Sequence, residues 1–486
     1  MEDRKTIVLI RPDFSSLTQY IYKQVNPPIG LGYLASYLEE NGYVVHVIDL
    51  ALKRVEFNDL VEYIKKSNPL LVGISALTAY YGGMKILSRN LRQALPNIVL
   101  VLGGVHPSSV PKYAINECNA DFVVIGEGEE TLLELARAIE YGDTDYAMIK
   151  GIAYHEGDEV KITAKRDLIA DLDALPIPAW SKINPNTYPK IPHGTILKYT
   201  QIAPILSTRG CPFECAYCAS CRFWGQKIRF RSPSKIVDEI QYLHEKFGIR
   251  EIHFWDDNLT LKRDHIIGIC KEIIKRKLNH MAFSTPNGVK VDTLDVKVMR
   301  WMKAAGFYSF TFAIESGSSR ILREMGKKIS LAKIVQNTVI AHEIGIKLNS
   351  FFMIGFPGDT METIRKTMQL ANSIPLDYRT FFILKPLPGS KIFIDWARSR
   401  DLLNYDWDDL KCYMEASDLE INQLPPDLIQ KMHKKAQNIN FIPPKRLFNL
   451  LWIILRFFHF SQMKLQVERI VHAIAGYSMA LYHDSQ

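Results

Sequence analysis

The sequence lacks the features that mark membrane-spanning, secreted and disulfide-rich proteins. Its 486 residues contain no run of about 18 uncharged apolar residues, so we expect no spanning helix. The first residues, MEDRKTIVLIRPD, begin with acidic side chains and hold only a short apolar run, unlike a signal peptide. Cysteines number only seven, and an odd count in so long a chain argues against a disulfide framework. These absences predict a cytoplasmic, multidomain enzyme.

An excess of charge and the common nucleotide-binding motifs are missing as well. The formal net charge is +8, which does not demand a nucleic-acid partner in a chain of this length. Neither the GxGxxG dinucleotide fingerprint nor a GxxxxGK[ST] phosphate loop is present, so dinucleotide dehydrogenases and P-loop NTPases gain no support. Hydrophobic residues nevertheless make up 47% of the chain, as in ordinary globular proteins.

The first 145 residues alternate short apolar strands with amphipathic helices. Strands are expected at Thr6–Ile10, Val44–Asp49, Leu70–Ser75, Ile98–Leu102 and Phe122–Ile125. Continuous apolar strands separated by helices are typical of a parallel, doubly wound sheet. We therefore expect an α/β protein whose residues 1–145 form a Rossmann-like domain.

Two glycine-containing loops follow strands of this expected domain, where doubly wound sheets bind ligands. One loop holds Gly104 and His106, and the other holds Gly126 and Glu127. Glycine lets a backbone approach a ligand closely, but a tight turn would need it equally. For His106, an ordinary packed loop residue is the alternative.

A second alternation covers residues 201–395, after a segment expected to be a linker at 146–200. In the linker, Tyr154–Lys165 predicts a hairpin and Ala174–Trp180 a proline-rich stretch over the surface. Six strand–helix units then predict a partial (β/α)6 barrel, with chemistry at the carboxyl ends of its strands. Strands are expected at Pro204–Ser207, Ile252–Asp256, Met281–Ser284, Phe310–Ile314, Leu348–Ile354 and Arg379–Leu384.

Residues 396–486 predict a small helical C-terminal region. Its apolar segment Lys445–Phe460, KRLFNLLWIILRFFHF, is too short and too charged to span a bilayer. Two readings remain open for it, a core helix or an interfacial membrane helix.

Four of the seven cysteines lie within eleven residues, in STRGCPFECAYCASCRFWG. Cys211, Cys215 and Cys218 have the spacing Cys-x3-Cys-x2-Cys and follow an expected strand. Three thiolates on one short segment can hold three irons of a cubane cluster and leave the fourth iron open. A zinc site is the alternative, although zinc favours two short cysteine pairs with a longer spacer. Cys221 receives no role.

The cysteine segment resembles the cluster-binding loop of the radical S-adenosylmethionine (SAM) superfamily, and further motifs match that superfamily in order. The N-terminal part, with PPIGLGYLASYLEENG, GGVHP and GEGEETLLEL, is similar to the cobalamin-binding domain often fused to these enzymes, in the methyltransferase and anaerobic magnesium-protoporphyrin cyclase branch. The matching barrel motifs are FWDDNLT (Phe254–Thr260), STPNGVKVDTL (Ser284–Leu294), FAIESGS (Phe312–Ser318), FFMIGFPGDTMET (Phe351–Thr363) and PLPGS (Pro386–Ser390).

The resemblance implies a set of cofactor-binding residues. Cys211, Cys215 and Cys218 would bind a 4Fe-4S cluster, whose open iron binds SAM. The residues implied around SAM are Tyr217, Asp257, Asn258, Glu315, Gly355, Phe356 and Pro357, with Lys290, Arg229 and Arg231 as further anion contacts. These residues also have structural alternatives. Asp257 and Asn258 could cap the helix that follows them, and Glu315 could cap the helix that begins near Ser318. Gly355–Gly358 could be only a turn.

Cobalamin is implied by the N-terminal resemblance, with Gly104, His106, Gly126 and Glu127 on its edge of the sheet. Many cobalamin domains carry DxHxxG, whose histidine binds cobalt, but this chain reads RPDFSSLTQ there. The resemblance does not make His106 a cobalt ligand. A methylthiotransferase is disfavoured, because only Cys118 stands where those enzymes carry a second cysteine triplet.

The implied function is reductive SAM cleavage and hydrogen abstraction, with cobalamin-dependent C-methylation of a hydrophobic or natural-product substrate. A radical cyclase or carbon–carbon bond-forming enzyme of tetrapyrrole or lipid metabolism is one alternative, and a non-catalytic iron–sulfur redox sensor is another. The implied partners are a small-molecule substrate, a flavodoxin or ferredoxin as electron donor, and a membrane surface in contact with Lys445–Phe460. No nucleic acid is expected.

Overall fold

The computed structural model describes residues 5–14, 25–190, 195–398, 400, 402, 407–410, 415–416, 421 and 423–438. The chain divides into two compact units, Met1–Gln437 and Asn438–Gln486, and the first unit contains both sheets. The segment Lys445–Phe460, with its two readings, lies outside the described residues. In the described part of the chain, no helix combines the length and apolar character needed to cross a bilayer.

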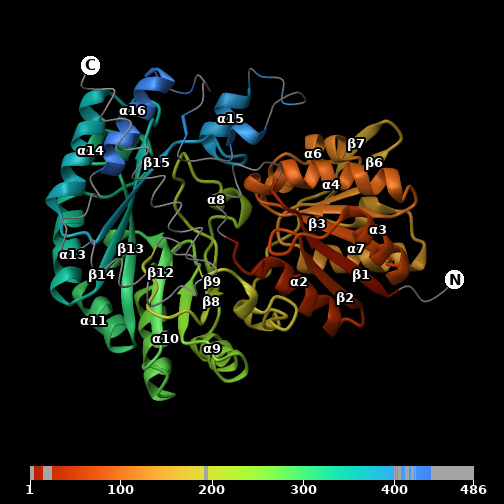
Figure 1. Cartoon of the computed structure of the whole chain (residues 1–486), viewed down its shortest axis with the longest axis horizontal. Helices are drawn as coiled ribbons and strands as arrows, with labels where there is room; N and C mark the ends of the chain where they lie inside the picture. The colour runs from red at the N-terminus through yellow and green to blue at the C-terminus, as the bar shows by residue number, and fades with distance from the viewer. Residues whose placement is uncertain are drawn as a thin grey trace. The chain divides into compact units, whose positions relative to one another are not determined.

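The N-terminal sheet has seven strands in the order β2-β1-β3-β4-β5-β6-β7 (Figure 1). The first five are mutually parallel, which confirms the expected Rossmann-like domain. They are β1 (Thr6–Arg11), β2 (Val44–Asp49), β3 (Leu71–Ser75), β4 (Leu100–Gly103) and β5 (Phe122–Val124). The helices between and after them are α2 (Ile29–Glu40), α3 (Phe57–Ser67), α4 (Tyr81–Ala94), α5 (Val105–Ser109), α6 (Pro111–Cys118) and α7 (Glu129–Tyr141).

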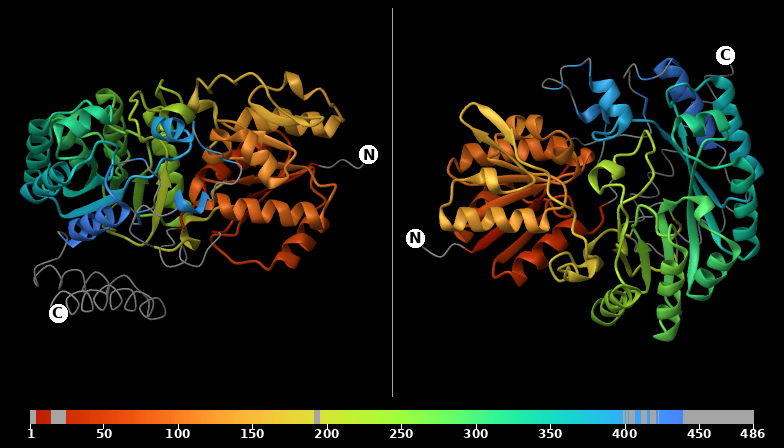
Figure 2. Two further views of the ribbon diagram at one scale, coloured as in Figure 1. Left: turned by 90° about the horizontal axis from the view of Figure 1, so that it is seen from above. Right: turned by 180° about the vertical axis from the view of Figure 1, so that it is seen from behind.

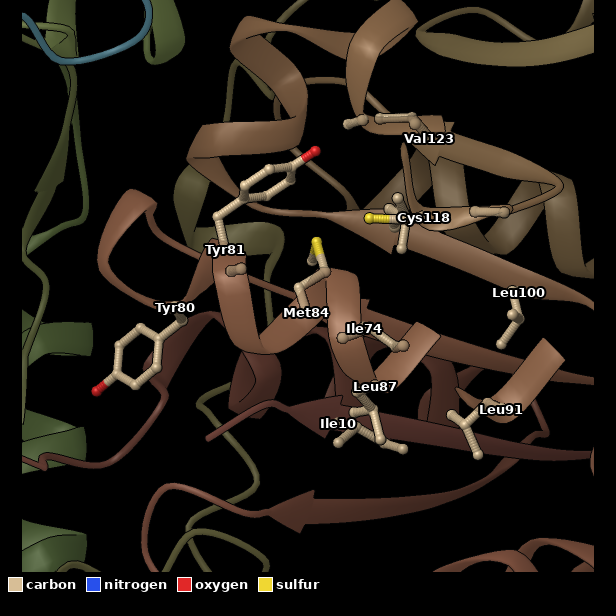
Figure 3. Packing of buried hydrophobic residues seen from close by; sticks show 14 of the residues in the cluster. Ile10, Ile74, Tyr80, Tyr81, Met84, Leu87, Leu91, Leu100, Cys118 and Val123 are labelled. Atoms are coloured by element: carbon tan, nitrogen blue, oxygen red, sulfur yellow. The ribbon is translucent and has the colours of Figure 1, made fainter. Parts of the chain in front are cut away.

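Both faces of this sheet are buried, which explains its continuous apolar strands. Neighbouring side chains of a strand point to opposite faces. Accordingly Ile7 and Leu9 of β1 join one core cluster, while Val8 and Ile10 join the other. Figure 3 shows Ile10 and Ile74 in the second cluster, together with Met84, Leu87 and Leu91 of α4.

The region expected as a linker needs two corrections. The hairpin β6 (Ile152–Glu156) and β7 (Glu159–Ile162) continues the N-terminal sheet, with β6 antiparallel to β5, so the sheet extends past residue 145. The proline-rich stretch does not run over the surface throughout, because Trp180 is 1% exposed and donates its Nε1–H to Glu239. The short helices α5 and α6 had no clear periodic signal and were not expected.

The second sheet has six parallel strands in the order β15-β14-β13-β12-β11-β8, which confirms the partial (β/α)6 barrel. The strands are β8 (Ile202–Ile205), β11 (Glu251–Phe254), β12 (Ala282–Val289), β13 (Phe307–Glu315), β14 (Lys347–Ile354) and β15 (Tyr378–Ile383). Helices α9 (Pro233–Phe247), α10 (Arg263–Lys275), α11 (Val296–Ala304), α13 (Leu331–Glu343) and α14 (Met361–Ser373) lie along its outer face (Figure 2).

Local signals place the beginnings of several barrel helices. Side chains of Ser232, Asp295, Ser330 and Thr360 accept hydrogen bonds from backbone N–H groups in the first turns of α9, α11, α13 and α14. The short helix α12 (Ser319–Glu324) follows β13. Beyond the barrel, α15 (Lys391–Ala397), the 3-10 helix η6 (Trp407–Leu410) and α16 (Pro426–Gln437) are the described helical elements.

Candidate functional site

The four clustered cysteines lie in one loop, residues 210–228, which we call the cysteine loop. Its two ends are joined by a short antiparallel pair, β9 (Thr208–Arg209) and β10 (Arg229–Phe230). Gly210 begins the loop with φ = +104°, and a Cβ there would lie 2.7 Å from the carbonyl oxygen of Lys227. Glycine is therefore required at this position for two reasons. The backbone is left-handed, and the Lys227 backbone at the other end of the loop comes too close for a Cβ.

Neighbouring elements hold the middle of the loop. The Ala216 N–H donates to the Met325 carbonyl oxygen at 2.9 Å, and the Ala216 carbonyl accepts from the Ile392 N–H at 3.0 Å. A Cβ at Gly326 would come within 2.9 Å of the Glu214 carbonyl oxygen. The loop thus rests on the segment after α12 and on the first turn of α15, beside the carboxyl ends of the strands.

The three cysteines expected as metal ligands are half-buried free thiols. Burial raises the pKa of Cys211 to about 11 and that of Cys218 to about 12. Burial also raises the pKa of Cys215, against the opposing effect of Lys327. The thiols are therefore protonated at neutral pH, and binding a metal must release their protons.

The chemistry of these donors, three thiols on one loop, fits an iron–sulfur cluster. Within the described ranges, no three Cys, His, Asp or Glu side chains are grouped as ligands of one metal ion. Three thiolates on one loop, each with its own iron, are the ordinary ligand set of a cubane with an open corner.

Tyr217, inside the cysteine loop, meets Glu315 at the end of β13. The Tyr217 hydroxyl donates to Glu315 Oε1 at 3.0 Å, and the Lys327 ammonium donates to the same oxygen at 3.1 Å. Glu315 has φ = +70°, a conformation that favours glycine, so its side chain is held at some backbone cost. It does not cap α12, whose N-cap is Ser318. Such strain is often found at functional sites.

Asp257 and Asn258 follow β11 on the other side of the loop. Asp257 Oδ1 accepts a hydrogen bond from the Ser220 hydroxyl at 2.7 Å, and burial raises the pKa of Asp257. Asn258 is buried, and its Nδ2 has no hydrogen-bond partner. Neither residue caps α10, which begins after Lys262. An unpartnered buried amide is a feature that a bound polar ligand would satisfy.

Gly355, Phe356 and Pro357 form the turn after β14. Gly355 has φ = +82°, and the N–H groups of Gly355 and Phe356 both donate to Asp359 Oδ2 at 3.1 Å. Phe356 belongs to a small apolar cluster against which Tyr217 packs. The turn is therefore real, and it also brings Phe356 to the cysteine loop.

In the N-terminal domain, Gly104 and His106 lie at the carboxyl end of β4. Gly104 has φ = +94°, and a Cβ there would lie 2.6 Å from the Ala76 carbonyl oxygen. His106 is fully buried, with its ring 3.8 Å from that of Tyr81 and edge-on to that of Trp407. Burial lowers the pKa of His106 to about 3. His106 is thus a packed neutral imidazole, and its Nε2 has no hydrogen-bond partner.

Gly126 and Glu127 follow β5 and make different kinds of contact. Gly126 has φ = +84° and donates its N–H to Ser108 Oγ at 3.1 Å. Both carboxylate oxygens of Glu127 are already taken, by Arg209 at 2.8 Å and by Arg229 at 2.7 Å. The carboxylate is thus engaged within the protein, and a contact of Glu127 with cobalamin stays a prediction.

The further anion contacts also lie differently from the expectation. Arg229 is used by Glu127, and Arg231 forms a buried ion pair with Glu239. Lys290 pairs with Asp292, and its ammonium lies 4.7 Å from the centroid of the Phe213 ring.

Comparison with known protein families gives two matches that follow the two sheets. Residues 205–371 match the radical SAM superfamily, and residues 22–136 match the B12 binding domain. An uncharacterized methyltransferase of Pyrococcus horikoshii is 31% identical over 443 residues, which cover 90% of this chain and 93% of that protein. The chain belongs to the B12-binding radical SAM superfamily.

Two further comparisons support this placement. The anaerobic magnesium-protoporphyrin IX monomethyl ester cyclase of Cereibacter sphaeroides is 28% identical, over 82% of this chain and 65% of the cyclase. The radical SAM methyltransferase TsrM of Kitasatospora setae shares the fold, with a TM-score of 0.70 at 19% identity, over 91% of this chain and 89% of TsrM.

As a member of this superfamily, the chain is a radical SAM enzyme whose cofactors are a 4Fe-4S cluster, SAM and cobalamin. Such an enzyme needs a reductant and a substrate. The three thiols fit the cluster by donor type, and the unpartnered Asn258 amide fits a polar ligand beside it.

Two residues of this site, Lys327 and Asp256, were not predicted from the sequence. Lys327 has no motif of its own, and only the chain's return past the cysteine loop brings it to Glu315. Asp256 could have been found, since it stands beside Asp257 in FWDDNLT. Its Oδ1 accepts hydrogen bonds from the Ser207 N–H and from the hydroxyls of Ser207 and Thr208, and so ties β11 to the stem of the loop.

Proposed function

We propose that this radical SAM enzyme is a cobalamin-dependent C-methyltransferase that acts on an unactivated carbon of a small molecule. Cys211, Cys215 and Cys218 hold the cluster in this proposal. The observation that carries it is the meeting of Tyr217, Glu315 and Lys327 at the cysteine loop. A carboxylate, an ammonium and a phenol at one point suit the hydroxyl, carboxylate and adenine groups of SAM.

Roles for the residues around SAM follow from their chemistry. Glu315 accepts hydrogen bonds from the ribose hydroxyls, for which a carboxylate is a good acceptor. Asp257 and the amide oxygen of Asn258 accept from the amino group of SAM, and the unpartnered Asn258 Nδ2 donates to its carboxylate. Tyr217 and Phe356, which share one apolar cluster, line the adenine together with the Gly355–Pro357 turn.

Lys327 takes the carboxylate of SAM in this arrangement. Its ammonium is 4% exposed and forms an ion pair with Glu315. While Glu315 accepts from the ribose hydroxyls, the remaining N–H groups of the ammonium can donate to the SAM carboxylate. Lys is a compact point charge and can turn between two such partners.

Cobalamin lies at the carboxyl edge of the N-terminal sheet. Gly104 and Gly126 both have left-handed backbones there, and neither offers a Cβ that would keep a ligand away from the loop. His106 would shape this loop by packing and would not bind the cofactor, because Tyr81 and Trp407 lie against its ring.

When bound, the reduced cluster and SAM supply an adenosyl radical that removes hydrogen from the substrate, and cobalamin supplies the methyl group. The chain's own residues hold these groups and exclude water. Tyr217 packs against the apolar cluster that contains Phe356, and this packing helps to exclude water. The substrate is a small molecule with an accessible apolar carbon framework.

A radical cyclase is the second candidate, favoured by the similarity to the magnesium-protoporphyrin cyclase. Methylation is preferred because the similarity to the Pyrococcus methyltransferase spans 93% of that protein, whereas the similarity to the cyclase spans 65%. The electron donor is a small flavodoxin- or ferredoxin-type protein.

The test uses anaerobically purified enzyme, reconstituted with iron and sulfide and loaded with hydroxocobalamin. After addition of SAM and a chemical reductant, S-adenosylhomocysteine and 5′-deoxyadenosine are measured. A methyltransferase yields both, and the S-adenosylhomocysteine tracks bound cobalamin. A cyclase yields 5′-deoxyadenosine alone, and a sensor yields neither.

The control replaces Cys211, Cys215 and Cys218 by alanine and compares this variant with Cys221→Ala. The triple variant is expected to lose iron, sulfide and both products, while C221A keeps them. Retention of the full cluster by the triple variant would overturn the ligand assignment.

A further inference from the structure

A buried group of four charges connects the B12 domain to the stem of the cysteine loop, and we call it the charge bridge. It consists of Glu127, Glu129, Arg209 and Arg229. Arg209 donates to Glu127 Oε1 at 2.8 Å and to Glu129 Oε1 at 2.6 Å, and Arg229 donates to Glu127 Oε2 at 2.7 Å. All four side chains are between 4% and 6% exposed, so water does not screen these ion pairs.

The two arginines stand at the two ends of the cysteine loop. Arg209 lies in β9, two residues before Cys211, and Arg229 lies in β10, where the loop closes. Glu127 therefore holds both ends of the loop with its two carboxylate oxygens. A guanidinium has a planar, fixed set of donors, so each ion pair fixes direction as well as distance.

Further contacts strengthen this connection. The Arg209 guanidinium lies 5.0 Å from the centroid of the Tyr33 ring of α2 and 5.3 Å from that of Trp224 in the loop. The Ile169 N–H donates to Glu127 at 2.9 Å, and Arg229 donates to the Ile169 carbonyl at 2.8 Å. The bridge is thus enclosed by the B12 domain, by the segment after it and by the loop itself.

Within the B12 domain, Glu127 directly follows Gly126, in the loop to which the proposed function assigns cobalamin. Gly126 is fixed by its left-handed backbone and by its hydrogen bond to Ser108 Oγ. A ligand that contacts this loop therefore acts on the residue next to Glu127, and Glu127 holds both ends of the cysteine loop. Glu127 thus links the loop assigned to cobalamin with the two ends of the loop assigned to the cluster.

We propose that Glu127 is a positioning residue that couples cobalamin binding in the N-terminal domain to SAM binding at the cysteine loop. This inference rests on the proposed function, because it takes the cluster and cobalamin to occupy the sites assigned there. The coupling is reciprocal: if cobalamin strengthens SAM binding by some factor, SAM strengthens cobalamin binding by the same factor. A role limited to stability would not produce such a factor.

The decisive variant is Glu127→Gln, which keeps the size and one acceptor oxygen but removes the charge that both arginines share. The matched control is Glu134→Gln. Glu134 is also on the segment after β5, in α7, but it pairs with Arg166 at the surface and not with the cysteine loop. Glu127→Asp, which keeps the charge on a shorter side chain, is the conservative comparison.

The measurement is the dissociation constant of SAM for each reconstituted enzyme, by equilibrium dialysis, with and without hydroxocobalamin. The electron paramagnetic resonance spectrum of the reduced cluster with SAM serves as a second readout. The wild type is expected to bind SAM about fivefold or more tightly with cobalamin, within the usual range of such couplings. E127Q is expected to retain cluster and cobalamin, with this ratio reduced to about one. E134Q keeps the wild-type ratio, and E127D restores part of it.

Three results would overturn the coupling while leaving the proposed function intact: a wild-type ratio of about one, an unchanged ratio in E127Q, or an equal loss in E134Q. If E127Q does not fold, the double variant E127Q/R229Q, which removes one charge of each sign, replaces it with the same expectation. Failure of the wild type to hold a cluster or cobalamin would instead refute the proposed function, and this inference with it.

Discussion

At the scale of single residues, Asp256 shows how the site combines satisfied and unsatisfied polar atoms. Its Oδ1 accepts three hydrogen bonds from Ser207 and Thr208, while its Oδ2 is buried without a partner. Burial raises the pKa of Asp256 to about 6, although the hydrogen bonds from Thr208 and Ser207 oppose the shift. The ionised carboxylate is therefore costly in the folded apoprotein.

The sign of the resulting pH dependence follows from linkage. An aspartate with a folded pKa near 6 and an unfolded pKa of about 3.9 contributes its stability fully below pH ~4 and loses it as the pH rises through 6. Asp256→Asn keeps the Oδ1 acceptor and has no charge to bury. We expect D256N to be more stable than the wild type at pH 7.5, by an amount on the order of 2 kcal/mol.

The measurement is urea unfolding of the apoprotein at pH 7.5 and pH 5.0. The advantage of D256N should shrink at the lower pH, where the wild-type carboxyl is largely protonated. An advantage that is equal at both pH values, or absent at pH 7.5, would contradict a buried charge at Asp256.

At this scale the sequence was informative where motif and chemistry coincide. The spacing of Cys211, Cys215 and Cys218 predicts cluster ligands, and the structure brings the predicted Glu315 to the same loop through Tyr217. Glu127 was assigned to cobalamin because its loop is on the ligand edge, but a side chain's partner depends on which domain packs against it. Arg209 and Arg229 are more than 80 residues away along the chain, and no local pattern reports that contact.

At the scale of elements, the β9–β10 pair decides whether the three cysteines are presented together. Because it has only two residues in each strand, its geometry depends on Gly210. Gly210→Ala would place a Cβ 2.7 Å from the Lys227 backbone, in a left-handed conformation that alanine disfavours. Both effects push the two strands apart, so we expect G210A to lose more than half of its iron and sulfide.

The matched control is Gly157→Ala, in the turn between β6 and β7. Gly157 also has a left-handed backbone, φ = +59°, but a Cβ there would meet nothing within 4 Å. G157A should lose a little stability and keep its iron and sulfide. Equal iron contents in G210A and the wild type would show that the β9–β10 pair does not determine how the cysteine loop presents its three thiols.

The same scale explains which elements could be predicted. The parallel strands carry continuous apolar runs because both faces are buried, so their positions agree with expectation to within a few residues. The hairpin over residues 152–162 was expected as a hairpin, but not as part of the sheet. Its outer strand, β7, lies at the exposed edge. The sequence therefore gives no sign that its inner strand, β6, pairs with β5. The short α5 and α6 offer too few turns for a periodic signal.

At the scale of the whole molecule, described elements after the barrel return to the N-terminal domain. Trp407 of η6 and Phe393 of α15 belong to the same core cluster as Val8 and Tyr81. The Trp407 ring is 4.7 Å from that of His106, and 2% of the residue is exposed. The core of the B12 domain is therefore completed by residues more than 300 positions farther along the chain than Val8 and Tyr81, which no local pattern could reveal.

Because Trp407 fills part of the core of the B12 domain, we expect its removal to destabilise that domain. Trp407→Ala removes a buried ring from the core and is expected to lower the free energy of unfolding by about 3–5 kcal/mol at pH 7.5. The matched control is Trp301→Ala on α11, where the ring is only half-buried, and its effect should be clearly smaller. Thermal and urea unfolding of both variants measure the difference.

His106 gives this prediction a second, independent signature. In the wild type its pKa is lowered to about 3 by burial, so the stability it contributes is present above pH ~6.5 and is lost as the pH falls. Removing Trp407 admits water to the imidazole and lets its pKa rise toward the unfolded value, so the variant loses less on acidification. The deficit of W407A should therefore be smaller at pH 5.5 than at pH 7.5, by up to about 1 kcal/mol. A deficit that does not change with pH would mean that Trp407 fills space in this core without keeping His106 dry.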